Sequence, residues 1–141
     1  MLELVDMKGF KGNIEELVAK NIDFRQVIYT AKHSQLVLMS LAPSEEIGME
    51  VHKDSDQFFR FESGQGKVIV DLTEYDVNGG DVVIVPAGTN HNVINVSSTD
   101  SLKLYTLYSP PHHRDKVVHK TKQEAEADSE YFDAVVTETT S

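Results

Sequence analysis

Short runs of apolar residues recur along the chain, separated by polar and glycine-containing segments. The runs are rich in Val, Ile, Phe and Tyr, which favour pleated, half-buried strands. They predict strands over residues 24–30, 34–41, 57–61, 67–72, 74–77, 82–85, 92–96 and 102–108. Closely spaced strands without helices between them are typical of an antiparallel sandwich or barrel. The pattern therefore predicts an all-β fold.

Helical signals are confined to the two ends of the chain. Asn13, with a glutamate three residues later, is a capping pattern that predicts a short helix over residues 13–20. Thr121 repeats the pattern near the other end, where we expect a turn or two of helix. From about Asp128 the chain is polar and acidic, which predicts a frayed tail.

These elements fit a single domain. A chain of 141 residues, 40% of them hydrophobic, is long enough to bury one core. We expect a barrel core over residues 34–111, preceded by a helix and an edge strand over residues 1–33. A loop, a helix and the tail follow over residues 112–141.

Composition narrows the classes of function. A formal net charge of −10 argues against binding to nucleic acid, whose phosphates would be repelled. No apolar run approaches the roughly 20 residues of a membrane-spanning helix, and the first residues do not resemble a signal peptide. The chain has no cysteine, so any metal must be held by histidine, carboxylate, amide or water. These features favour a cytoplasmic protein.

The stretch from Gly80 to Asn95 has the most informative pattern in the chain. A β-branched run at 82–85 predicts a buried strand, and the proline after it should end that strand. We expect the run to form a hairpin with the strand at 92–96, with His91 at its mouth. Gly88 stands in the turn, where we expect a backbone conformation that disfavours a β-carbon.

This stretch resembles the second conserved motif of the cupin superfamily. That motif reads glycine, five residues, Pro-x-Gly, two residues, histidine, three residues, asparagine. Its fixed positions are filled here by Gly80, Pro86, Gly88, His91 and Asn95. The resemblance implies a double-stranded β-helix, the jelly-roll barrel of the cupins, with short terminal helices.

A first cupin motif is expected upstream, reading glycine, five residues, His-x-His, three or four residues, glutamate, six residues, glycine. The stretch from Gly48 to Gly64 resembles it only in part. Gln57 stands at the position of the glutamate, seven residues before the last glycine. With His52 as the first histidine, Asp54 takes the position of the second, and the distance to Gln57 is one residue off. We therefore expect a bulge or shift in this loop.

The resemblance implies that His52, Gln57 and His91 converge on one divalent metal ion. Imidazole suits Zn, Ni and Fe, and amide or carboxylate oxygens suit Mn and Fe, so the identity of the metal stays open. Gln57 is neutral, and Asp54 or Asp56 is the candidate for the missing anion.

Three further histidines follow the last strand, at positions 112, 113 and 119. Adjacent side chains on an extended chain point in opposite directions, which is poor geometry for binding one ion. We therefore favour packing, or a lid near the barrel mouth, over a second metal site.

Two functions compete for such a barrel. The first is a metal-dependent enzyme, isomerase-like or dioxygenase-like, acting on a small oxygen-rich molecule. A sugar phosphate would need cationic side chains, and the candidates are Arg60, Lys103 and Arg114. The second is a non-catalytic module that binds a small, sugar-like molecule beside a degenerate metal site. In either case the resemblance, and the need to cover sheet edges, lead us to expect a homodimer.

Overall fold

A computed structural model describes residues 8–138. Two short helices lie near the ends of the chain, α1 (Ile14–Lys20) and α2 (Lys122–Ala127). The strands are β1 (Arg25–Thr30), β2 (Gln35–Leu41), β3 (Asp56–Ser63), β4 (Gln65–Val70), β5 (Thr73–Asn78), β6 (Val82–Val85), β7 (His91–Asn95), β8 (Leu102–Ser109) and β9 (Val118–His119). The predicted all-β class, with short terminal helices, is confirmed.

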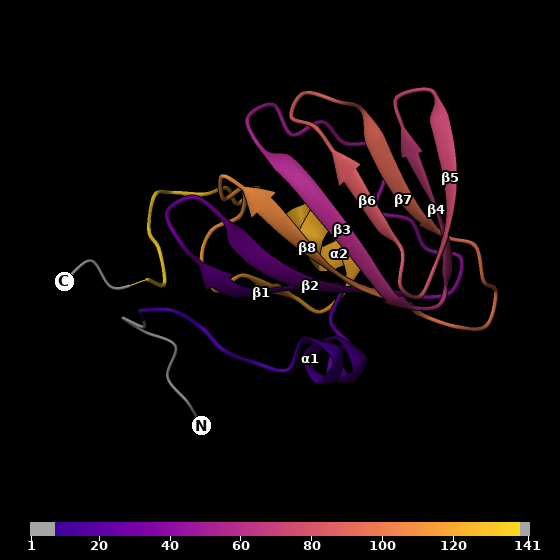
Figure 1. The fold of residues 1–141 in the computed structure, drawn as a ribbon, viewed down its shortest axis with the longest axis horizontal. Helices are drawn as coiled ribbons and strands as arrows, with labels where there is room; N and C mark the ends of the chain where they lie inside the picture. Colours follow the sequence, from indigo (N-terminus) through magenta and orange to yellow (C-terminus); the bar gives the residue numbers. More distant parts are fainter. Residues whose placement is uncertain (1–7, 139–141) are drawn as a thin grey trace.

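The strands form two antiparallel sheets that face each other across the core (Figure 1). The larger sheet has the order β6-β3-β8-β2-β1-β9, and the smaller has the order β5-β4-β7. Side chains of β3 and β8 alternate between buried and half-buried, so one face of each strand lies in the core. Phe59 and Phe61 of β3 are fully buried there.

Helix α1 covers part of the outer face of the larger sheet. Val18 packs against Ile28 of β1 and Leu38 of β2, away from the main core. The Asn13 side chain accepts a hydrogen bond from the N–H of Glu16 at 3.0 Å, which confirms the predicted cap. Within residues 8–138, neither helix has the length and apolar composition needed to cross a membrane.

The predicted hairpin between residues 82–85 and 92–96 is wrong. Strand β6 pairs with β3, whereas β7 pairs with β4 in the other sheet. The turn around Pro86 and Gly88 therefore carries the chain from one sheet to the other. The predicted buried strand at 82–85 is buried on one face only: Val83 and Val85 point into the core, whereas Val82 and Ile84 are exposed.

The C-terminal segment is more ordered than the sequence predicts. Thr137 is buried, and its N–H donates to the carbonyl of Thr30 at 2.9 Å, so no frayed tail begins at Asp128. Residues 139–141 of that predicted tail lie outside the described residues. Strand β9, which the sequence analysis does not include, pairs with residues 25 and 26 of β1. Strand β1 is therefore an edge strand only in its later part.

Gly88 has φ +80°, in the left-handed region that a β-carbon disfavours. A β-carbon built there meets nothing within 4 Å, so the cost of a side chain comes from the backbone alone. We expect Gly88→Val to lower the free energy of unfolding by about 1–3 kcal/mol. Chemical denaturation measures this, with Ala87→Val, at the exposed neighbouring position, as the control. Equal stability of the two variants would contradict the strain at this turn.

Candidate metal centre

Backbone hydrogen bonds bring the two motif segments together. The N–H of Glu50 donates to the carbonyl of His91 at 2.8 Å, and the N–H of His91 donates to the carbonyl of Glu50 at 2.9 Å. The N–H of Gly88 donates to the carbonyl of His52 at 2.8 Å. The Pro-x-Gly turn and the start of β7 therefore hold the loop of residues 50–52 directly.

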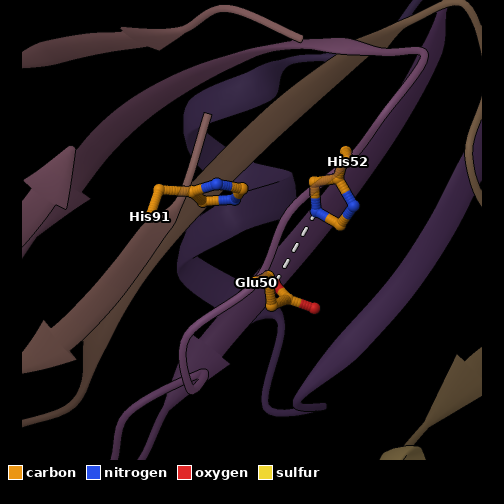
Figure 2. A group of neighbouring side chains, drawn as sticks. All are labelled: Glu50, His52 and His91. Carbon is orange, nitrogen blue, oxygen red and sulfur yellow. Dashed lines mark ion pairs between the residues drawn. The ribbon is translucent and has the colours of Figure 1, made fainter. Parts of the chain in front are cut away.

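Three side chains meet where these segments touch: Glu50, His52 and His91 (Figure 2). One ligand atom from each lies within 4.8 Å of the other two. His52 Nε2 lies 3.7 Å from Glu50 Oε1, and both histidines are buried. Two imidazoles and a carboxylate at this spacing are a donor set suited to a divalent metal ion.

The histidines present lone pairs that nothing in the described chain uses. His91 Nδ1 lies 2.9 Å from the carbonyl oxygen of Thr89. Because a carbonyl only accepts, Nδ1 carries the proton and Nε2 is left as a bare lone pair. His91 Nε2 and both ring nitrogens of His52 are buried without a hydrogen-bond partner among residues 8–138. Buried polar atoms normally have partners, so His91 Nε2 and the unprotonated nitrogen of His52 fit a bound cation.

A chain of hydrogen bonds that starts at Glu130 and passes through His113 and Tyr108 orients the amide of Gln57. Glu130 Oε2 lies 2.6 Å from Nδ1 of His113, whose Nε2 lies 3.1 Å from the hydroxyl of Tyr108. The carboxylate accepts from Nδ1, so Nε2 accepts the Tyr108 O–H. The Gln57 amide then donates its N–H to the oxygen of Tyr108. Gln57 Oε1 is left buried without a partner in the described chain.

Burial holds His52 in the neutral state that metal binding requires, but it disfavours the ionised state of Glu50. Burial, assisted by the positive charge of His112 and His91, lowers the pKa of His52 to about 3. Its imidazole is therefore neutral at pH 7. Burial also raises the pKa of Glu50, although Arg25 and His91 oppose this. A cation beside Glu50 would offset the cost of keeping its carboxylate ionised.

The predicted bulge disappears when the first motif is placed two residues earlier. Glu50 then takes the first histidine position and His52 the second, with four residues between His52 and Gln57, which stands seven before Gly64. Ser44 falls at the position of the motif's first glycine and has φ 64°, a conformation that glycine adopts easily. The spacing alone could have revealed Glu50, because in the shifted alignment every fixed position of the first cupin motif falls at the expected distance from the next.

The structure does not bring the two candidate aspartates into this group. Asp54 is exposed and lines a separate surface cavity with His112 and Tyr131. Asp56 Oδ1 accepts a hydrogen bond from the N–H of Ala87 at 2.8 Å, which fixes the turn after β6.

The expectation that His112 and His113 point in opposite directions is wrong. The chain bends here instead of running as a strand, and both rings pack against Tyr108, at centroid distances of 5.3 and 5.0 Å. The ring of His112 also lies 4.1 Å from that of His52. His119 is buried elsewhere, against Arg25.

Two facing antiparallel sheets, with ligand-type side chains gathered where the two motif segments meet, define a small jelly-roll domain of the double-stranded β-helix type. The chain matches the Cupin domain family over residues 37–108, and it belongs to that family.

Relatives support this assignment over most of the chain. The chain is 43% identical to YrkC of Bacillus subtilis over 126 residues, which are 85% of this chain and 67% of YrkC. It is 46% identical to L612 of Acanthamoeba polyphaga mimivirus over 104 residues, 72% of this chain and 65% of L612. The chain thus spans about two thirds of the length of both relatives. The crystal structure of BH2720 from Bacillus halodurans superposes with a TM-score of 0.84 at 38% identity, covering 88% of this chain and 99% of that one.

Proposed function

We propose that this cupin binds one divalent metal ion through Glu50, His52, Gln57 and His91. The observation that carries the proposal is the set of buried atoms without partners in the described chain: both nitrogens of His52, His91 Nε2 and Gln57 Oε1. These atoms come from the two motif segments that the backbone holds together. A metal ion would satisfy His91 Nε2, Gln57 Oε1 and one of the two nitrogens of His52 at once.

The charge of the site agrees with this proposal. Gln57 is neutral where the cupin motif has a glutamate, but Glu50 supplies a carboxylate where the motif has a histidine. The donor set therefore keeps one negative charge. Imidazole nitrogens with carboxylate and amide oxygens suit Mn, Fe, Ni or Zn.

The proposed role of the site is metal-dependent catalysis on a small oxygen-rich molecule, of the isomerase or dioxygenase type. A bound metal would act as a Lewis acid that polarises a substrate oxygen. Neighbouring side chains position the proposed ligands. Tyr108 orients the Gln57 amide, the ring of Phe59 packs beside His91, and the ring of His112 packs beside His52. Non-catalytic binding is the second candidate, favoured by the neutral Gln57. A homodimer and a cytoplasmic location stay predictions.

The choice of carboxylate gives a sharp test of the donor set. We expect Glu50→Gln to weaken binding of Mn(II) or Zn(II) at least about 10-fold, because it removes the only anion of the set. Asp54→Asn, a matched change at an exposed carboxylate four residues from Glu50, should leave the affinity unchanged. Isothermal titration calorimetry on the metal-stripped protein measures both. Equal losses in the two variants would contradict the assignment of Glu50.

A further inference from the structure

Arg25 is a buried cation that lies next to the candidate metal centre. It begins β1, outside the matched cupin region, and its side chain is 6% exposed. No carboxylate among residues 8–138 lies within ion-pair distance of it. A buried charge without a partner of opposite sign is costly, so its retention calls for an explanation.

The guanidinium is held in place from one side only. Nη1 donates to His119 Nδ1 at 3.2 Å, and His119 Nε2 donates in turn to Asp128 Oδ2 at 3.0 Å. The ring of Phe24 lies against the cation, with its centroid 5.3 Å from Arg25 Cζ. Nε of Arg25 is buried and has no partner in the described chain. The guanidinium of Arg25 is therefore fixed in position, but its Nε–H donor has no acceptor in the described chain.

A cavity of 160 Å³ is lined by Arg25 and by one residue of the candidate metal group, Glu50. Phe24, Ile47 and Ala125 supply apolar walls, while Lys122 and Glu126 of α2 line the remaining side. A small ligand in this cavity would therefore meet Arg25 and Glu50 together.

We propose that Arg25 binds the carboxylate of a small ligand that occupies this cavity and reaches the metal centre with its other end. The inference rests on the proposed function, because a metal would offset the negative charge of Glu50 that otherwise repels an anion. Guanidinium and carboxylate match as two parallel hydrogen-bond donors and acceptors, a geometry that lysine does not reproduce. Helix α2 and the His119–Asp128 pair, both from the C-terminal segment, then help to form the ligand site.

Calorimetric titration of the metal-loaded protein with malonate tests the proposal, with neutral malonamide as the matched probe. Metal content is measured before and after, so that chelation by malonate is recognised. We expect malonate, and not malonamide, to bind the wild type. Arg25→Gln should weaken malonate binding about 10–100-fold while the metal affinity stays unchanged. Arg60→Gln, at a half-exposed arginine on the outer face of β3, should leave both unchanged.

Arg25→Lys provides a second variant in case Arg25→Gln does not fold. It keeps the charge but loses the fork, and we expect it to weaken malonate binding as well. Equal affinity of the wild type and both Arg25 variants for malonate would overturn the proposal. So would equal binding of malonate and malonamide to the wild type. Inorganic phosphate binding more tightly than malonate would overturn the assignment of a carboxylate.

One further variant separates this inference from the proposed function. If the wild type binds no metal, the proposed function fails. Metal-free Glu50→Gln, which removes one of the two carboxylates that line the cavity, then tests anion binding without the metal. Malonate binding to Glu50→Gln, together with no binding to the Glu50→Gln, Arg25→Gln double variant, would show that Arg25 binds a carboxylate without a metal. Absence of such binding would overturn it.

Discussion

His91→Ala is expected to weaken divalent metal binding at least about 100-fold. Loss of a residue that only hydrogen-bonds to a metal ligand has a smaller effect. The bond from Nδ1 to the carbonyl of Thr89 fixes the tautomer that presents Nε2, and alanine offers no substitute for that lone pair. Calorimetric titration with Mn(II) and Zn(II) measures the loss. His33→Ala is the matched control, because His33 is exposed in the turn between β1 and β2.

Comparison of His91→Ala with His33→Ala also distinguishes the loss of a metal ligand from a loss of folding. His91 is buried, so alanine leaves a cavity, and we expect His91→Ala to unfold at a lower temperature than the wild type without metal; each variant is therefore compared with itself with and without metal. With saturating metal, only the wild type and His33→Ala should gain stability, because a ligand that binds the native state stabilises it. An equal gain in His91→Ala would show that His91 is not a ligand.

Asn95→Ala is expected to have the largest effect on stability, lowering the free energy of unfolding by about 2–4 kcal/mol. Asn95 is 1% exposed, and its Nδ2 lies 3.2, 3.1 and 2.8 Å from the carbonyl oxygens of Leu41, Ala42 and Asp100. Its Oδ1 accepts from the N–H of Ser97 at 2.9 Å. Alanine would remove all of these bonds and leave buried backbone groups with fewer partners.

Urea denaturation measures this change, with Asn90→Ala as the control because Asn90 is exposed in the turn before β7. Asn95 joins the end of β2 to the loop before β8, so its hydrogen bonds stabilise the start of the segment that leads to Glu50. A loss of less than about 0.5 kcal/mol, the range of ordinary surface substitutions, would contradict this role.

Features set by local chemistry could be predicted from the sequence. The cap at Asn13, the left-handed backbone at Gly88 and the burial of Phe59 each depend on a few neighbouring residues. The two cupin motifs also bring His52 and His91 to one place, as the resemblance implies.

Features that depend on contacts between distant parts of the chain could not be predicted from the sequence. The partners of β6 and β7 lie in different sheets, and a run of β-branched residues does not specify its partner. The inward position of Arg25 depends on its pairing with β9 and on cover from α2. Glu50 was missed for another reason, since a carboxylate stands where the motif has a histidine.

The metal content of the protein is the measurement that tests the central claim most directly. The protein is produced without a histidine tag, equilibrated with Mn, Fe, Ni and Zn, passed through a desalting column and analysed by mass spectrometry of the elements. Our account predicts close to one bound divalent ion per chain in the wild type, and almost none in the His52→Ala, His91→Ala double variant. A wild type without metal, or a double variant that retains as much, would contradict it.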